Sequence, residues 1–464
     1  MKLRKIITSL GVAVVLLAGS ICAHAANVVQ VPAEETDSVY QQTVQTNELE
    51  KWADGPQIYS ESGIVMDMDS GAILYGKNID APHYPASITK LLTALVALEN
   101  TEMTDIVTVK QEDIEFLHYD DSHIGLKVGE EITMEDAMHG MLLASANEVS
   151  HAIASSTEGG YDAFLKRMND RAKELGCTNS NFVNVHGLHD EEHYTSARDM
   201  ALIGSELFKY EDFRRITTTL EYTIPVTNIT NETRTFQQHH RMLFDWRSQY
   251  YEPCVGGKTG YTDDALSTLV TFASKDGVNL VAVVMRSHGS STNTYVDTKA
   301  MLEYGFSNFN KVSVTTEMVE AKGLKDVQEN SYVMLPEGII FEDLKGHIQY
   351  PTELEDRTCY ISYTYQEQPV GKITATITDE YYKELHNIVD PEPVKKTEPK
   401  KTSIVVLIVK IILILLLIAV LGFLLLVCYA MYRRRQRRKR RAEMRRRKRQ
   451  LEYQRYLKQM RDNE

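Results

Sequence analysis

Alternation of apolar and polar positions predicts two β-hairpins in the first 300 residues. Residues 62–75 contain two short apolar runs on either side of Asp69-Ser70-Gly71, and a polar turn between two such runs is typical of a hairpin. The apolar runs 266–274 and 278–285 are joined by Lys275-Asp276-Gly277, and Asp-Gly is a strong hairpin-turn signal. We therefore expect antiparallel strands both early and late in this region.

Helical spacing of apolar residues dominates the stretch between the two hairpins. Leu91, Leu92, Leu95 and Leu98 fall on one face of a helix, and Pro85 stands just before its first turn. Further helices are predicted at 134–143, 149–153, 163–175 with a stop at Gly176, 200–207 with Ser196 and Asp199 as its capping box, and about 295–304 with an end before Gly305.

The order of these elements predicts the fold class. A strand pair, a long helical stretch and then further strands indicate an α+β or mixed α/β domain, in which helices cover a sheet. From 311 to about 378, short β-rich runs alternate with turns, for example at 360–365 and 371–377. This second region reads as a small all-β domain without a reactive cluster.

The two ends of the chain have a different composition. Residues 1–25 combine three early cations, an apolar run and Ala23-His24-Ala25, which is typical of a cleaved secretory signal peptide. Residues 404–432 are almost wholly apolar and long enough to span a membrane once. Because positive residues next to a span stay in the cytoplasm, the basic tail 433–464 places everything before the span outside the cell.

These limits divide the chain into seven parts. We expect a single-pass protein of the cell membrane, with an extracellular folded region and a cytoplasmic C-terminus. The parts are a signal peptide (1–25), a polar spacer (26–56), a main domain (57–310), a small β-rich domain (311–385), a linker (386–403), a transmembrane helix (404–432) and a basic cytoplasmic tail (433–464).

The charge distribution limits the possible binding partners, and the cysteine content limits the possible disulfides. The formal net charge is −13, although the tail 433–464 alone holds 16 lysines and arginines against 4 acidic residues. The exterior part is therefore strongly acidic, and we expect no nucleic acid as its partner. The tail is compatible with RNA or anionic lipid, but a topology signal is the simpler account. Cys177, Cys254 and Cys359 are too few for a disulfide framework.

The helix that begins after Pro85 carries candidate chemistry. Ser87 and Lys90 are three residues apart, so both side chains project from one face of its first turn. A hydroxyl beside an amine that can take its proton is an activated nucleophile, and unpaired N–H groups at a helix start suit a developing oxyanion. The alternative is an ordinary serine near a helix start and a solvated lysine.

Two later motifs favour catalysis. Ser145-Ala146-Asn147 and Lys258-Thr259-Gly260 follow Ser87-x-x-Lys90 in chain order. Together the three resemble the active-site set of penicillin-binding proteins and serine β-lactamases. The residues around them, such as Gly140-Met141-Leu142-Leu143, are similar to the low-molecular-mass D-alanyl-D-alanine carboxypeptidases over about residues 55–385. The resemblance implies a β-lactamase/transpeptidase-like main domain.

The resemblance also implies a role for each site residue. Ser87 would be the nucleophile that removes the terminal D-alanine from peptidoglycan stem pentapeptides and that β-lactams acylate. Lys90 would be the general base, with Ser145 and Asn147 relaying protons and orienting the substrate. Lys258 and Thr259 would hold the substrate carboxylate, Gly260 would admit the substrate backbone, and Tyr261 with Ser87 would supply the oxyanion hole. No cofactor and no metal are expected.

Three positions depart from the usual family pattern. Glu148 follows Ser-x-Asn where aspartate is common, residues 184–188 lack a frequent proline, and Ala265-Leu266 replaces a common Ala-Gly. These departures bear on substrate preference and deacylation rate more than on the type of reaction.

Three alternatives remain open on the sequence. His186, His189 and His193 lie near Asp190, Glu191 and Glu192 and have a spacing compatible with a metal site. A membrane-anchored β-lactam-binding receptor would keep the fold but would not turn over. A β-lactamase would use the same serine, but it needs a deacylating glutamate that we do not find.

Overall fold

The computed structural model describes residues 33–350, 357–386 and 411–435. The chain divides into two compact units, residues 1–387 and residues 388–464. The predicted signal peptide, 1–25, and most of the predicted linker and basic tail lie outside the described residues.

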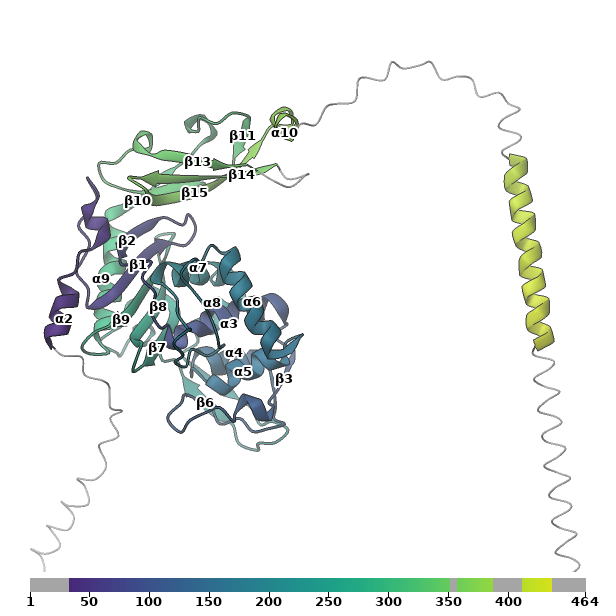
Figure 1. The fold of residues 1–464 in the computed structure, drawn as a ribbon, viewed down its shortest axis with the longest axis horizontal. Helices are drawn as coiled ribbons and strands as arrows, with labels where there is room; N and C mark the ends of the chain where they lie inside the picture. Colours follow the sequence, from purple (N-terminus) through teal and green to yellow (C-terminus); the bar gives the residue numbers. More distant parts are fainter. Residues whose placement is uncertain (1–32, 351–356, 387–410, 436–464) are drawn as a thin grey trace, which may run out of the picture. The chain divides into compact units, whose positions relative to one another are not determined.

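A five-stranded antiparallel sheet is the centre of the first unit (Figure 1), and both predicted hairpins belong to it. The strand order is β2-β1-β9-β8-β7, so the early hairpin lies beside the late one and β7 forms an edge. The strands are β1 (Ser60–Asp67), β2 (Ile73–Lys77), β7 (Cys254–Thr262), β8 (Leu266–Lys275) and β9 (Val278–Ser287).

Both faces of this sheet are buried. Along β9, Val281, Val283 and Met285 belong to one apolar cluster, whereas Leu280 and its alternate neighbours belong to another. Successive strand residues point to opposite faces, so a strand covered on both sides must be apolar throughout. This explains the unbroken apolar run at 280–285.

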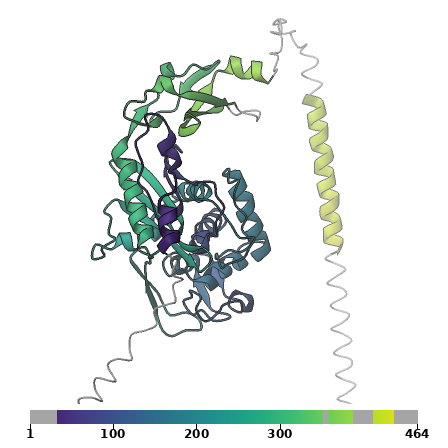
Figure 2. The same cartoon turned by 60° about the vertical axis from the view of Figure 1, so that its left-hand side comes forward.

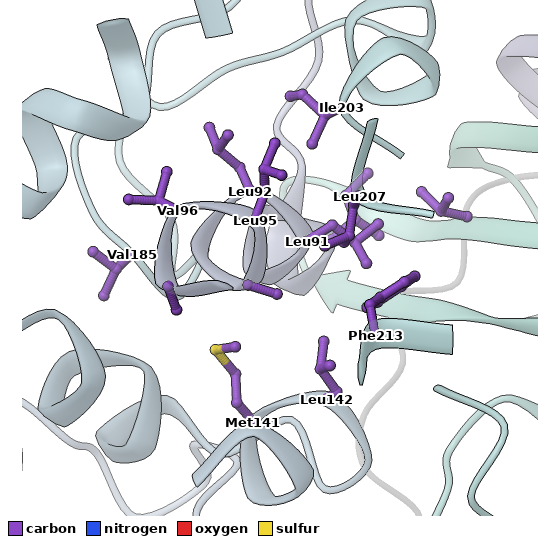
Figure 3. Close-up of a cluster of buried hydrophobic side chains, with 14 of the residues drawn as sticks. Leu91, Leu92, Leu95, Val96, Met141, Leu142, Val185, Ile203, Leu207 and Phe213 are labelled. Carbon is purple, nitrogen blue, oxygen red and sulfur yellow. The ribbon is translucent and has the colours of Figure 1, made fainter. Parts of the chain in front are cut away.

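Helices that come between the two hairpins in the sequence cover one face (Figures 1 and 2). The central one is α3 (Lys90–Asn100), in which Leu91, Leu92 and Leu95 are fully buried. Figure 3 shows these leucines surrounded by apolar side chains of neighbouring helices, including Met141, Ile203 and others. The neighbours are α4 (Met134–Leu142), α5 (Asn147–Ser156), α6 (Gly160–Glu174), α7 (Ala197–Leu207) and α8 (Glu211–Thr217).

Short strand pairs and 3₁₀ turns lie around these helices, so the region from 100 to 130 is less helical than the sequence pattern suggested. Two-stranded pairs are β3 (Ile106–Thr108) with β4 (Glu131–Thr133), and β5 (Glu221–Ile224) with β6 (Arg234–Gln237). The 3₁₀ turns are η2 (Ala86–Thr89), η3 (Gln111–Asp113) and η4 (Arg241–Leu243).

The other face of the sheet is covered by α9 (Asn293–Asn308), which runs past its predicted end. Gly305 is helical and buried, and a Cβ there would lie 3.0 Å from a Leu280 methyl and 3.2 Å from one of Val65. The glycine allows close packing of helix on sheet, so the prediction of a stop before Gly305 is wrong.

Residues 33–56 differ from the polar spacer predicted for 26–56. They form α2 (Ala33–Tyr40) and η1 (Gln45–Glu48), and Val39, Val44 and Trp52 are buried. The buried Lys77 Nζ donates to the Val39 carbonyl oxygen at 2.8 Å. The segment packs against the domain through a few apolar side chains spread among polar ones. Their spacing has no helical or strand period, so the sequence pattern did not reveal them.

Strands follow α9 as predicted, and 360–365 and 371–377 are parts of β14 and β15. A separate all-β domain at 311–385 is not confirmed, because residues 1–387 form one compact unit and the region ends in a helix. Lys372 N, for example, donates to the Ser70 carbonyl oxygen at 2.7 Å. The elements are β10 (Phe309–Ser313), η5 (Thr316–Met318), β11 (Leu324–Val327), β12 (Tyr332–Pro336), η6 (Phe341–Asp343), β13 (Lys345–Gln349), β14 (Thr358–Tyr365), β15 (Gln368–Ile377) and α10 (Asp379–Leu385).

The second unit contains one described helix, Ile411–Arg435, which includes an 18-residue stretch with a mean hydropathy of 3.5. By length and composition it can cross a membrane. It overlaps the predicted span 404–432 and continues three residues beyond it, while 404–410 lie outside the described residues.

Candidate active site

Ser87 lies on a 3₁₀ turn, η2, and not on the first α-helical turn that the sequence pattern suggested. In a 3₁₀ turn, side chains three residues apart eclipse each other. Ser87 and Lys90 therefore point the same way, with 3.0 Å between Oγ and Nζ. Ala86, directly before the serine, has a φ of +53°, an unfavourable conformation for a residue with a Cβ.

Lys90 is fully buried, and its amine has three oxygen neighbours. Nζ donates to Asn147 Oδ1 at 2.7 Å and to the His186 carbonyl oxygen at 2.6 Å, and Ser87 Oγ is the third neighbour. Burial, followed by the positive charge of Lys258, lowers the pKa of Lys90 well below its usual value. A neutral amine has two N–H groups for the two acceptors and one lone pair, which is left for the serine proton.

Ser145 connects the second motif to the third. It precedes α5 with a φ of +61°, and its Oγ accepts from Lys258 Nζ at 3.0 Å. Lys258 Nζ also donates to the Thr259 carbonyl oxygen at 2.9 Å. Burial lowers the pKa of Lys258 to about 7. The three motifs, which are distant in sequence, thus meet in one place.

Gly260 allows the edge strand β7 to approach the nucleophile turn, which is η2 with Ser87. A Cβ at Gly260 would lie 2.4 Å from Thr268 Oγ1 and 3.0 Å from the Ser87 backbone nitrogen. Thr268, on β8, donates from Oγ1 to the Pro85 carbonyl oxygen at 2.9 Å and so ties the sheet to the turn. Sequence reasoning missed Thr268, because a threonine inside a strand carries no signal of such a bond.

A cleft of about 690 Å³ opens over these residues. Ser87, Ser145, Thr259, Gly260 and Tyr261 all line it, and Tyr261 is 41 % exposed. Lys90 and Asn147 lie buried behind Ser87, and Lys258 lies buried behind Ser145. All eight predicted site residues therefore lie in or directly behind this cleft.

One wall of the cleft comes from a loop that the sequence did not single out. Asp120 and Ser122 line the cleft, and the Ser122 carbonyl oxygen accepts from Asn147 N at 2.8 Å. Glu148 Oε1 accepts from Ile124 N and Gly125 N at 2.7 and 3.1 Å. Glu148, noted in the sequence only as a departure, thus fastens this loop across 24 residues of chain.

His239 and Arg241 also line the cleft and were missed, since the segment that holds them has no periodic pattern. Burial, with a smaller effect of Lys258, lowers the pKa of His239 to about 4, so its imidazole is neutral. The Arg241 guanidinium lies 5.7 Å from the centre of the Tyr295 ring.

The three histidines proposed as an alternative metal site have other partners. His193 Nε2 is 2.9 Å from Thr89 Oγ1, and its Nδ1 accepts from Val183 N at 3.0 Å. His186 Nδ1 accepts from Leu188 N at 3.1 Å, and His189 is 3.5 Å from an Asp264 carboxylate oxygen. Among the described residues, no group of three or more histidine, cysteine or acidic side chains is arranged to hold a metal ion. The geometry gives the metal alternative no support.

The fold and the cleft together place the protein in the class of penicillin-binding proteins and DD-peptidases with an active-site serine. Residues 49–289 match the family model described as D-alanyl-D-alanine carboxypeptidase, and the chain belongs to this family.

Individual relatives agree with this assignment. The chain is 33 % identical over 255 residues to D-alanyl-D-alanine carboxypeptidase DacF of Bacillus subtilis, a match that covers 54 % of this chain and 63 % of the relative. It is 30 % identical over 262 residues to DacB2 of Mycobacterium tuberculosis, covering 55 % and 84 %. The chain thus spans less than two thirds of the Bacillus relative.

Solved structures show the same fold. The Streptomyces K15 DD-transpeptidase has a TM-score of 0.51 and 27 % sequence identity, and the match covers 55 % of this chain and 100 % of that chain. The D-alanyl-D-alanine carboxypeptidase of Mycobacterium tuberculosis has a TM-score of 0.50 and 30 % identity, covering 57 % and 96 %.

Proposed function

We propose that this protein is a serine-type D-alanyl-D-alanine carboxypeptidase that removes the terminal D-alanine from peptidoglycan stem pentapeptides through an acyl-enzyme on Ser87. The observation that carries the proposal is the buried Lys90 amine, 3.0 Å from Ser87 Oγ and already occupied by two other acceptors. The family membership of residues 49–289 supports it.

In the first step, Lys90 acts as the general base. Its neutral amine takes the Ser87 proton while Oγ attacks the carbonyl carbon between the two D-alanines. The backbone N–H groups of Ser87 and Tyr261 form the oxyanion hole for the resulting tetrahedral intermediate. The Ser145 hydroxyl passes the proton to the leaving amine, Asn147 orients the Lys90 amine and the substrate, and water then hydrolyses the acyl-enzyme.

Recognition of the substrate depends on the edge strand β7. Lys258 and Thr259 hold the terminal carboxylate of the peptide by charge and by hydrogen bond. Because Gly260 has no side chain, the substrate backbone can lie against β7 as an added strand. β-Lactams acylate Ser87 by the same route, since they present a carboxylate and a reactive carbonyl with similar spacing.

Labelling combined with product release tests this function. Intact-mass measurement after brief exposure to penicillin should show one added acyl group that maps to Ser87, and the protein should release D-alanine from a peptide ending in D-Ala-D-Ala. Ser87→Ala should lose both, whereas Ser248→Ala, at an exposed serine outside the cleft, should keep both.

The outcomes also separate the two alternatives. An acyl-enzyme that persists for hours without D-alanine release would favour a β-lactam-binding receptor, and rapid turnover of penicillin would favour a β-lactamase. Release of D-alanine by Ser87→Ala would overturn the assignment.

We also propose that the enzyme works at the outer face of the cell membrane. The helix Ile411–Arg435 would be the anchor, and the arginines from 433 onward would keep the C-terminus in the cytoplasm. Residues 311–385 would act as a β-rich module that contacts the cell wall. Accessibility of the protein to an added protease in intact cells tests the orientation.

A further inference from the structure

His193, one of the three histidines that the sequence offered as a metal site, contacts the nucleophile turn. It lies in the segment between α6 and α7 and is only 1 % exposed. Its ring bonds to Val183 on one side and, on the other, to Thr89, the last residue of η2. Burying a polar side chain costs free energy unless it is hydrogen-bonded, and here both ring nitrogens are paired.

The direction of each hydrogen bond follows from the groups involved. A backbone N–H can only donate, so Nδ1 of His193 accepts from Val183 N at 3.0 Å. Burial lowers the pKa of His193 to about 4, so the ring is neutral and its one proton is on Nε2. Nε2 therefore donates to Thr89 Oγ1 at 2.9 Å. The Thr89 hydroxyl keeps its own proton and donates it to the Ala86 carbonyl oxygen at 2.9 Å.

The Ala86 carbonyl belongs to the same peptide unit as the Ser87 N–H, which is one of the two proposed oxyanion donors. Because a peptide unit is planar, fixing its carbonyl also fixes the direction of its N–H. Ala86 has a φ of +53°, and a residue with a Cβ keeps such a conformation only when the surrounding structure holds it. A hydrogen bond accepted by the carbonyl also polarises the unit and strengthens its N–H as a donor.

We propose that His193 and Thr89 are positioning residues for the oxyanion hole, an inference that rests on the function proposed above. His193 orients the Thr89 hydroxyl, and the hydroxyl holds the Ala86–Ser87 peptide unit with its N–H toward the oxygen of the tetrahedral intermediate. Both side chains are buried, and neither lines the cleft. Since charge on that oxygen develops only in the transition state, the pair speeds acylation and leaves the affinity for unreacted ligand unchanged.

The kinetics of acylation by penicillin separate positioning from binding. Thr89→Val removes the hydroxyl at nearly constant side-chain volume. We expect the limiting rate constant of acylation to fall by about tenfold, while the penicillin concentration that gives half of this rate changes by less than about twofold. Thr89→Ser keeps the hydroxyl and should recover most of the rate.

Two substitutions of His193 distinguish its two hydrogen bonds. A glutamine amide reaches the position of Nε2 and can donate to Thr89, whereas an asparagine amide reaches only the position of Nδ1. His193→Asn should therefore slow acylation by about fivefold, and His193→Gln should slow it less. Because both residues act through one carbonyl, Thr89→Val combined with His193→Asn should be no slower than Thr89→Val alone.

The infrared band of the ester carbonyl in the acyl-enzyme reports the oxyanion hole directly, because hydrogen bonds to this oxygen lower its stretching frequency. Thr89→Val should shift the band to higher frequency. Thr271→Val is the matched control, since Thr271 is also fully buried, its Oγ1 lies 2.8 Å from His240 Nε2, and neither residue lines the cleft. This control should lose thermal stability but keep the ester band and the acylation rate.

Failure of the inference is distinguishable from failure of the proposed function. Acylation of Thr89→Val at the unchanged rate, an unmoved ester band, or equal slowing in Thr271→Val would overturn the role of His193 and Thr89 and leave the carboxypeptidase intact. Neither acylation nor D-alanine release by the unsubstituted protein would instead overturn the proposed function. If Thr89→Val does not fold, equal acylation rates in His193→Asn and His193→Gln would overturn the inference.

Discussion

Lys90 and Lys258 are both buried at the cleft, and their neighbours differ. The difference suits Lys90 to act as a base and Lys258 to bind a carboxylate. The Lys90 amine lies between two acceptors and the Ser87 hydroxyl. Among the described residues, the Lys258 amine has only Ser145 Oγ and a backbone oxygen as partners, so a substrate carboxylate would add an anionic one. Because each cation opposes the charging of the other, an uncharged Lys90 beside a charged Lys258 is the arrangement that allows both tasks.

The pH dependence of kcat/KM tests this division. The pKa of Lys258 is lowered to about 7, so the free enzyme loses this charge as the pH rises above that value. Carboxylate recognition, and with it kcat/KM for D-alanine release, should then fall by up to about tenfold per pH unit. Lys258→Arg keeps its charge throughout this range and should remove the fall, even where its maximum rate is lower. A fall at the same pH in Lys258→Arg would assign the titration to another group.

At the level of elements, the nucleophile turn is held by close backbone approaches. Gly187 has a φ of +87°, and a Cβ there would lie 1.9 Å from the Ala86 carbonyl oxygen. The neighbouring His186 carbonyl oxygen accepts from Lys90. The loop at 184–188 therefore positions both the turn and the general base, although it supplies no side chain to the proposed chemistry.

Gly187→Ala should lower the rate of acylation by penicillin by about 100-fold, because the methyl group must displace the Ala86 carbonyl and with it Ser87. Gly176→Ala is a matched control, since Gly176 has the same φ of +87° but no atom within 4 Å of the added Cβ. Both variants carry similar backbone strain, and Gly187→Ala should lose more thermal stability than the control because only its methyl group meets the Ala86 carbonyl. If the control slows acylation as much as Gly187→Ala does, the close approach is not the cause.

Some of the helices, strands and contacts could be predicted from the sequence, and others could not. The hairpins at 62–75 and 266–285 and the buried face of Leu91, Leu92 and Leu95 were predictable, because a local period reports burial directly. The three motifs lie together, as the resemblance to the family implied. Thr268, Glu148 and the loop at 120–125 were not predictable, since their bonds join residues that only the fold brings together.

Errors in the sequence interpretation have an equally physical origin. Gly305 was interpreted as a helix end, yet it lies where α9 packs closely on the sheet, and a glycine can serve either purpose. The segment 33–56 appeared to be a spacer because its burial rests on isolated residues such as Trp52. In both cases, the deciding partner is distant in sequence.

For the whole molecule, the described residues up to 386 form a unit that contains the complete cleft. Every side chain named in the proposed chemistry lies between 87 and 261, and the apolar clusters around it come from the same unit. The helix Ile411–Arg435 has no buried residue, and its large apolar side chains are exposed along its length. By length and composition, this helix is a candidate membrane span.

A chain that ends at His386 should therefore remain in solution with phospholipid vesicles and keep its kcat/KM for a soluble D-Ala-D-Ala peptide within about twofold, whereas the full chain should sediment with the vesicles. The 25 residues of the helix extend about 37 Å at 1.5 Å each, enough for a hydrocarbon core of about 30 Å. Leu415→Arg combined with Leu421→Arg in the full chain is the control, because two charges in the middle of the helix should weaken insertion without changing chain length. If the shortened chain loses activity while this double variant stays active off the membrane, residues beyond 386 support the fold of the cleft directly.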